Sequence, residues 1–309
     1  MSHVVLLGPQ FHHPTVGATL RELDIVGPVA TITAGWQEWE SEDAALNRQL
    51  GGTSVPLRLY QRSERVWEAD PELRAAHRSM QDDLRALHGL YARQLEPAAQ
   101  TWVDLLDADG PDHLLQPERD AALQAIQRLD AHLLQRIGEV RADFEEQTHV
   151  RERPAIARER EEISEALARV QTVVVEGGHV AALLNRILLF DVADMLTGKN
   201  LLGCAGGAML LCRRVILYND DPAIGRGHSE VALPGLGFGP GIVALPDAAV
   251  RLRLDDPRRM RRLALRLAPD RCALLDPGAR LHWDGREWTG LGALGVGSDG
   301  SVAAWERAA

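Results

Sequence analysis

Short apolar runs near the N-terminus predict buried β-strands. Residues Val4–Leu7 and 28–33 are rich in aliphatic and β-branched side chains, and residues 56–60 form a third candidate strand. Between the first two runs, residues 15–23 have the apolar spacing of a helix. Strands that alternate with helices predict a parallel sheet covered by helices, and ligands bind such sheets at the carboxyl ends of the strands.

The apolar pattern changes to a helical period in the middle of the chain. Residues 64–170 are rich in Glu, Arg, Gln, Ala and Leu, and their apolar residues recur three and four positions apart, which defines one face of a helix. The clearest such face comprises Leu123, Ile126, Leu129, Leu133, Ile137, Val140 and Phe144. Residues 107–112 form a strong turn signal. The pattern predicts a long helical hairpin, followed by a return helix over residues 154–170.

Turn signals reappear near the C-terminus, at residues 276–278, 284–285 and 298–300, between short apolar runs. This pattern predicts β-hairpins at the edge of a sheet. The expected fold class is therefore α/β, with a mostly parallel sheet flanked by helices, a long α-helical insertion and C-terminal β-hairpins.

The same patterns divide the chain into three parts. Residues 1–62 are the first part of the α/β domain, residues 63–170 are the helical insertion, and residues 171–309 are the second part with its closing strands. A long two-helix arm can pack on a second copy of itself. We therefore expect a homodimer that forms through the insertion.

Composition and charge limit the classes to which the protein can belong. The chain has 309 residues, of which 45% are hydrophobic and 25% charged, and this is ordinary for a soluble globular protein. Its net charge of −10 argues against nucleic acid or an anionic membrane as the main partner. Three cysteines are too few for a disulfide framework, and no apolar run has the length of a membrane span. We expect a cytoplasmic protein that contacts neither membrane nor nucleic acid.

Candidate chemistry is concentrated in residues 201–209, where an apolar run meets small residues and a helical pattern begins. A sharp turn from strand to helix of the form G-x-[SC]-x-G exposes the nucleophile of several hydrolase families at its third place. Counted from Gly203, that place holds Ala205. The turn is therefore typical of a catalytic elbow, but the reacting atom is missing.

Three further motifs follow the same order as those of a known family. They are the loop Gly177-Gly178 after an apolar run, the turn at residues 219–222, and the glycine-rich segment at residues 235–241. Together with the elbow, these motifs resemble the cyanophycinase and aspartyl dipeptidase family of serine peptidases, which has a class I glutamine amidotransferase-like fold. The resemblance is best over residues 201–300 and does not extend to residues 60–170.

The resemblance implies a site that has lost two of its three catalytic groups. It places Ala205 at the nucleophile position, Asp247 at the histidine position and Asp220 at the acid position. Without a nucleophile and an imidazole, neither proton transfer nor formation of an acyl-enzyme proceeds by the triad route. Backbone N–H groups do not depend on the lost side chains and remain candidates to bind a carbonyl or carboxylate. These candidates belong to Gly177, Gly178, Gly206 and Gly207.

The first hypothesis is therefore a catalytically degenerate protein of this family, a binding or scaffolding subunit for a small peptide or amino-acid-like ligand. One alternative is a cysteine-dependent hydrolase or amidotransferase-like enzyme, because the next register of the elbow resembles the thiol elbow of the PfpI/ThiJ-type branch of the same superfold. There Cys204 is the nucleophile, and His179 or His228 is the base. Another alternative is a peptidase completed by a partner chain. No motif indicates a cofactor, and no spacing of ligands indicates a metal.

Overall fold

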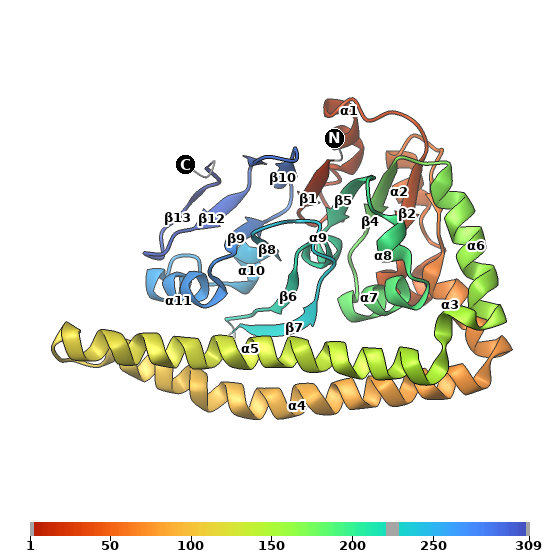
Figure 1. The fold of residues 1–309 in the computed structure, drawn as a ribbon. Helices are drawn as coiled ribbons and strands as arrows, with labels where there is room; N and C mark the ends of the chain where they lie inside the picture. Colours follow the sequence, from red (N-terminus) through yellow and green to blue (C-terminus); the bar gives the residue numbers. More distant parts are fainter. Residues whose placement is uncertain (1–2, 221–228, 307–309) are drawn as a thin grey trace.

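The structure is a computed structural model that describes residues 3–220 and 229–306. Seven strands form its central sheet, in the order β11-β10-β1-β5-β4-β2-β3 (Figure 1). The strands are β1 (Val4–Leu7), β2 (Val29–Ile32), β3 (Val55–Pro56), β4 (Thr172–Val175), β5 (Asn200–Cys204), β10 (Arg280–Trp283) and β11 (Trp288–Leu291). The five from β1 to β3 in this order are parallel, and β10 and β11 extend the sheet antiparallel at one edge. The predicted mostly parallel sheet is confirmed.

The central strands form continuous apolar runs because both faces of the sheet are covered. All residues of β1, β2 and β4 are buried. On one face, Val5, Leu7 and Leu202 pack with apolar residues of α1 (Val16–Glu22) and α2 (Ala44–Gln49). On the other face, the larger core includes residues of α7 (Val180–Leu189) and α9 (Gly206–Leu211). A strand covered on both faces needs apolar residues at every position rather than at alternate ones.

A second, smaller sheet and a two-stranded ribbon complete the β-structure. The sheet has the order β13-β12-β9-β8, and the ribbon pairs β6 with β7. Their strands are β6 (Arg214–Leu217), β7 (Glu230–Pro234), β8 (Ile242–Pro246), β9 (Arg271–Leu275), β12 (Leu294–Val296) and β13 (Val302–Ala304). The hairpins predicted from the turns at residues 284–285 and 298–300 are present as β10-β11 and β12-β13. They belong to two different sheets.

The middle of the chain is helical, as predicted. It comprises α3 (Leu59–Ala69), α4 (Pro71–Asp107), α5 (Asp112–Thr148), the 3-10 turn η2 (Val150–Glu152) and α6 (Pro154–Ala168). Asp70 starts α4, because its carboxylate accepts a hydrogen bond from the backbone N–H of Leu73 at 2.9 Å and Pro71 occupies the first helical position. With 37 residues each, α4 and α5 are about 55 Å long. Among the described residues, no helix has both the length and the apolar character needed to cross a membrane.

The strand predicted at residues 56–60 is wrong for most of its length. Only Val55–Pro56 pairs with the sheet, and α3 begins at Leu59. Arg58, between them, has a left-handed conformation with φ 54°, which ends the strand. Leu57 and Leu59 are both buried and lie two positions apart, which is the spacing typical of a strand. The backbone in fact changes from strand to helix between them.

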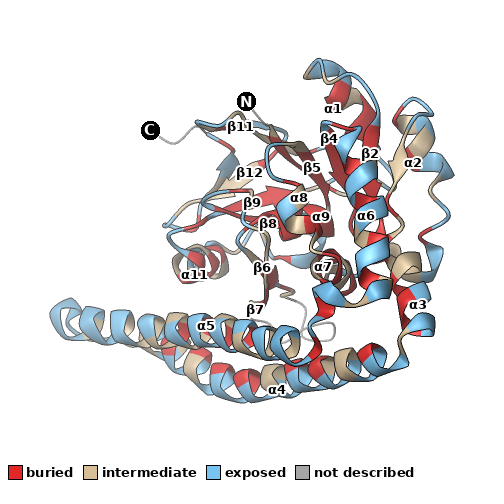
Figure 2. Ribbon diagram, turned by 45° about the vertical axis from the view of Figure 1, so that its right-hand side comes forward, coloured by how far each residue is buried: buried red, intermediate tan, exposed pale blue. Residues whose placement is uncertain are grey.

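The hairpin of α4 and α5 lies against the α/β part of the molecule (Figure 1). Buried residues of the two helices pack on each other, and Figure 2 shows them interrupted by exposed positions, as expected of an amphipathic pair. Tyr91 of α4 donates a 2.6 Å hydrogen bond to the carboxylate of Asp130 of α5. The same carboxylate is paired at 3.1 Å with Arg266 of α11 (Pro257–Leu267), and all three side chains are buried. This cluster ties the middle of the hairpin to the α/β part, while the turn at residues 107–112 lies beyond α11.

Candidate functional site

The turn after β5 has the strained geometry of a catalytic elbow. Ala205 lies between the end of β5 and the start of α9, with φ 49° and ψ −114°. A positive φ is uncommon for any residue other than glycine and costs about 1–3 kcal/mol. The backbone N–H of Ala205 donates a 3.0 Å hydrogen bond to the carbonyl of Leu7, which fixes the turn to β1. The residue at the apex of the turn is the alanine that the sequence pattern predicted.

Close packing explains the small residues around this turn. A Cβ on Gly207 would lie 2.0 Å from the carbonyl oxygen of Val175, and one on Gly203 would lie 2.7 Å from the carbonyl oxygen of Gly207. The Gly-Gly loop also lies close to the elbow, since a Cβ on Gly177 would lie 2.8 Å from the backbone nitrogen of Gly206 and 3.1 Å from the methyl group of Ala205. Side chains at these positions would force the strands, the loop and α9 apart. The structure therefore brings the predicted loop and the predicted elbow into contact.

A cavity of about 670 Å³ lies over the elbow, between the α/β part and the helical hairpin. Volumes of this size are typical of small-molecule sites. Ala205 and Gly206 line it from the elbow, and Gly178 and His179 from the loop. Its hairpin wall consists of Gln81, Leu84, Arg85 and His88 of α4 and Arg141 of α5. The helical insertion therefore forms part of the candidate site, which the sequence pattern did not indicate.

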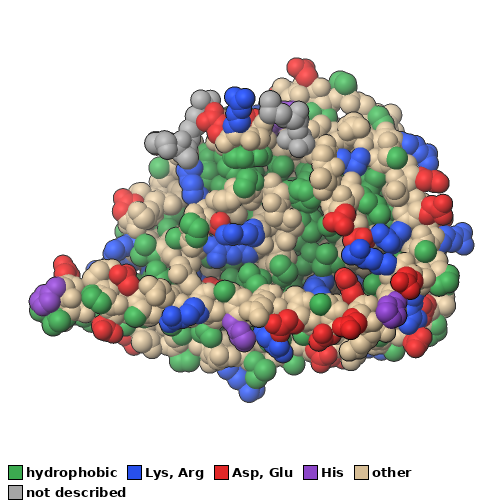
Figure 3. Space-filling model, in the orientation of Figure 1, with side chains coloured by type: hydrophobic (Ala, Val, Ile, Leu, Met, Phe, Trp, Pro, Cys, Tyr) green, Lys and Arg blue, Asp and Glu red, His purple; other side chains and the backbone are tan. Residues whose placement is uncertain are grey.

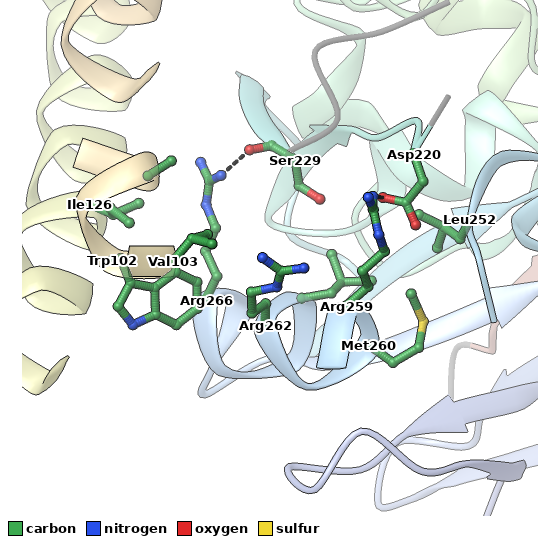
Figure 4. Close-up of a pocket in the computed structure, with 12 residues that line it drawn as sticks. Trp102, Val103, Ile126, Asp220, Ser229, Leu252, Arg259, Met260, Arg262 and Arg266 are labelled. Atoms are coloured by element: carbon green, nitrogen blue, oxygen red, sulfur yellow. Dashed lines mark hydrogen bonds and ion pairs between the residues drawn. The ribbon is translucent and has the colours of Figure 1, made fainter. Parts of the chain in front are cut away.

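Two of the three positions implied by the resemblance meet in this cavity. Asp247 follows β8 in a left-handed conformation with φ 57° and lines the cavity together with Ala205. Asp220 does not line it and instead borders a smaller pocket of about 80 Å³ between α11 and the hairpin (Figure 4). Its carboxylate accepts a 2.9 Å hydrogen bond from the backbone of Arg253 and lies 3.4 Å from the guanidinium of Arg259. Asp220 is thus engaged in fixing the segment around α11.

The proposed thiol nucleophile faces away from the cavity. Cys204 is 0% exposed and belongs to the core cluster on the side of the sheet that α1 and α2 cover. Burial and the neighbouring carboxyl group of Glu176 raise the pKa of the Cys204 thiol well above its ordinary value. A reactive cysteine needs the opposite, a lowered pKa and access to substrate. Cys204 is the last residue of β5, and its side chain packs on the face of the sheet that α1 and α2 cover, away from the cavity.

Of the two candidate bases, His179 lies at the cavity and His228 is not among the described residues. The ring of His179 accepts a 3.1 Å hydrogen bond at Nδ1 from the backbone N–H of Ala182 and so caps the start of α7. His179 also lines the cavity with its exposed side. His228 lies outside the described residues. No catalytic pair of Cys204 and a histidine is formed within residues 3–220 and 229–306, because the thiol is enclosed in the core.

Among the charged side chains that line the cavity, basic ones predominate, although the protein as a whole is acidic. Arg85, Arg141 and Arg251 line it, and Asp247 is the one carboxylate among its described lining residues. A neighbouring hollow of about 630 Å³ shares Arg85 with it, and its lining includes the further arginines Arg74, Arg78 and Arg186 together with Glu64. In the part of the chain that the structure describes, no three or more His, Cys, Asp and Glu side chains are grouped so as to hold a metal ion. The arrangement favours an anionic ligand.

Comparisons with solved structures give a distant structural likeness. No family model matches the chain, and no curated protein matches it. Among solved structures, it is similar to a peptidase from an acI-B1 actinobacterium, with 12% sequence identity and a TM-score of 0.38. That similarity covers 94% of this chain and 87% of the other.

Proposed function

We propose that this protein is a non-catalytic relative of the cyanophycinase-type serine peptidases, and that it binds a small peptide or amino-acid-like ligand in the cavity over the elbow. The observation that carries the proposal is the position of Ala205. An elbow strains its apex residue in order to present a side chain to the substrate, and here that side chain is a methyl group. A methyl group supplies neither a nucleophile nor a proton.

The rest of the cavity supports a role in binding. Gly178 and Gly206 line it, while Gly177 and Gly207 are buried in the packing beneath it. Asp247, at the position that the resemblance assigns to histidine, offers a carboxylate where a triad needs an imidazole. Apolar side chains such as Met209 contribute further to the lining. A mostly apolar cavity with a few polar groups is the usual form of a site for a small ligand.

The thiol alternative gains no support from the structure. All three cysteines are buried, and Cys204 has no path to the cavity through its own side chain. We expect iodoacetamide to label Cys204 slowly in the folded protein and all three cysteines readily after unfolding. Fast and selective labelling of Cys204 below neutral pH, mapped by mass spectrometry, would restore the cysteine-dependent enzyme as the better hypothesis.

Homodimerisation through the insertion also remains a proposal. The apolar stripes of α4 and α5 pack on each other within the chain. Among the described residues of the two helices, Leu90 and Leu114 are the large hydrophobic side chains with most of their surface exposed. On the face seen in Figure 3, the hydrophobic side chains of the hairpin are scattered among charged ones. Light scattering of the full chain over a range of concentrations tests for the dimer.

The proposed function is tested by an assay for peptide hydrolysis. The protein is incubated with aspartyl and β-aspartyl dipeptides, at a protein concentration close to that of the dipeptide. The amino acids released are then measured. We expect no release above the buffer blank, because the cavity holds no nucleophile at its elbow. Hydrolysis that rises in proportion to the protein concentration would refute the proposal. Cys204→Ala is the informative variant in that case, since only a thiol mechanism would lose the activity with it.

A further inference from the structure

A hollow of about 630 Å³ lies beside the elbow cavity and is bounded by α3, α4 and α7. Its volume is in the range of small-molecule sites. Four arginines line it, Arg74, Arg78 and Arg85 from α4 and Arg186 from α7, and Glu64 is the one carboxylate among its described lining residues. The whole chain has a net charge of −10. The hollow is therefore a local concentration of positive charge on an acidic protein.

The arginines of α4 lie on one face of the helix. Arg74, Arg78 and Arg85 are separated by four and seven residues, and these spacings return to the same side of an α-helix. At a rise of about 1.5 Å per residue, their Cα atoms are about 6 and 10 Å apart along the axis. All three residues are exposed, so a ligand in the hollow can reach their guanidiniums.

Most of this charge is not neutralised within the chain. The guanidiniums of Arg74 and Arg78 form neither a hydrogen bond nor an ion pair in the part of the chain that the structure describes. Arg85 is paired with Asp82, but both side chains are largely exposed, and such a pair on a helix surface contributes little. The α4 side of the hollow therefore presents two free guanidiniums and one that is weakly held.

The opposite side of the hollow carries a positive charge that is partly withdrawn from water. Arg186 lies 3.8 Å from the carboxylate of Glu64 and 5.1 Å from the centre of the Tyr60 ring, and burial lowers the pKa of its guanidinium. His77 also lines the hollow, and burial together with the charges of Arg186 and Arg141 lowers its pKa to about 4. The first turn of α7 adds the positive end of the helix dipole. An anion in the hollow would offset a repulsion that the chain's own carboxylates leave in place.

We propose that this hollow binds a polyphosphate, either as a free inorganic chain or as the triphosphate of a nucleotide. Guanidiniums line the hollow from two helices and are spread along about 16 Å of α4. The oxygens of a phosphate point in tetrahedral directions, so a chain of phosphates accepts hydrogen bonds from both helices along its length. The acceptors of a single carboxylate lie in one plane and cannot serve both sides in this way. The site does not depend on what the elbow cavity binds.

The test measures binding to the full chain by isothermal titration calorimetry, at constant ionic strength and without divalent cations. The probes are tripolyphosphate, ATP and citrate, of which citrate carries its charge on carboxylates. We expect tripolyphosphate to bind roughly tenfold more tightly than citrate. ATP that binds as tightly as tripolyphosphate indicates a site for the phosphate chain alone, and ATP that binds more tightly indicates a nucleotide site. Both results support the proposal.

Arg78→Gln is the principal variant, because Arg78 is exposed, unpaired and placed between the other two arginines of α4. It should weaken binding of tripolyphosphate roughly fivefold to tenfold, and its combination with Arg74→Gln should weaken binding roughly thirtyfold. Arg93→Gln is the matched control. Arg93 is an exposed residue of the same helix that does not line the hollow, and its substitution removes the same charge. The control variant should bind as the unaltered protein does, and circular dichroism of each variant excludes unfolding as the cause of a loss.

Three outcomes would overturn the proposal. The first is no binding of tripolyphosphate at millimolar concentration, whether or not ATP binds. The second is binding of citrate as tight as that of tripolyphosphate, because the hollow would then select charge rather than phosphate. The third is an equal response to Arg78→Gln and Arg93→Gln, which would show that the phosphate chain does not bind at this face of α4.

Discussion

The elbow and the helical hairpin enclose the same cavity but differ in how they are built. At the elbow, the backbone is strained and closely packed, while the apex side chain, Ala205, is inert. On the hairpin, two regular helices line the cavity with polar and charged side chains, among them Gln81, Arg85 and Arg141. The comparison shows that backbone geometry and chemical groups are separable features of a site. The geometry associated with catalysis lies on one wall, and the groups suited to recognition lie on the other.

The difference in packing predicts opposite effects for the same substitution on the two walls. Gly207→Ala places a methyl carbon 2.0 Å from the carbonyl oxygen of Val175, so β4 and α9 must separate. We expect the free energy of unfolding to fall by about 3 kcal/mol or more, as for severe overpacking. Urea unfolding followed by circular dichroism measures this change.

Gly89→Ala is the counterpart on the hairpin. Gly89 is an exposed residue inside α4, and a Cβ there meets no atom within 4 Å. Alanine is the better helix former, so the free energy of unfolding should rise by about 0.5–1 kcal/mol. If both substitutions destabilised the protein equally, the contrast between a packed elbow and a regular hairpin would be wrong.

The docking of the hairpin onto the α/β part predicts a dependence of stability on pH. His77 of α4 lies among the rings of Trp67 and Phe144, at centroid distances of 4.9 and 5.9 Å. Burial and the nearby positive charges of Arg186 and Arg141 lower the pKa of His77 to about 4. The folded protein therefore keeps this imidazole neutral, whereas the unfolded chain protonates it below its ordinary pKa of about 6.5.

The sign of the effect follows from proton binding. Between about pH 6.5 and pH 4 the unfolded state binds the extra proton, so stability is full above that range and falls as the pH decreases through it. The loss attributable to His77 should reach about 2 kcal/mol at pH 4, allowing for its partial exposure. Denaturant titrations of the protein and of His77→Gln across this range measure the difference. If the stability of the two proteins changed equally with pH, His77 would be solvated, and α3 and the hairpin would not enclose it as Trp67 and Phe144 indicate.

Elements set by local sequence were predictable from the chain alone. The strand Val4–Leu7 has its predicted bounds, and the turn signal at residues 107–112 lies where α4 ends at Asp107 and α5 begins at Asp112. The structure of residues 56–60 could not be predicted from the spacing of apolar residues. Leu57 and Leu59 are both buried, but the backbone changes from strand to helix between them. Over so few residues, the apolar spacings of strands and helices cannot be told apart.

The candidate site was predictable only where it is local. The elbow is formed by consecutive residues, and so Ala205 was found at its apex. Hydrogen bonds link Asn185 to Gln81 and to Arg141, residues 104 and 44 positions away in the sequence, and their meeting depends on how the hairpin docks. The same dependence on tertiary packing explains why Asp220 pairs with Arg259 instead of meeting Ala205.

A substitution at the apex residue tests the strain at the elbow itself. Ala205 keeps φ 49° and ψ −114°, a conformation that glycine adopts with little cost. Ala205→Gly should therefore raise the free energy of unfolding by about 1 kcal/mol, even though it removes a methyl group and loosens the unfolded chain. Ala208→Gly is the matched control, because Ala208 is a buried residue inside α9 and the substitution should lower stability by about 1 kcal/mol. If Ala205→Gly also lowered stability, the methyl group would be contributing packing, through its contact with Gly177, that outweighs the strain. The elbow would then be stabilised by its alanine, and the resemblance to a catalytic turn would be one of backbone shape alone.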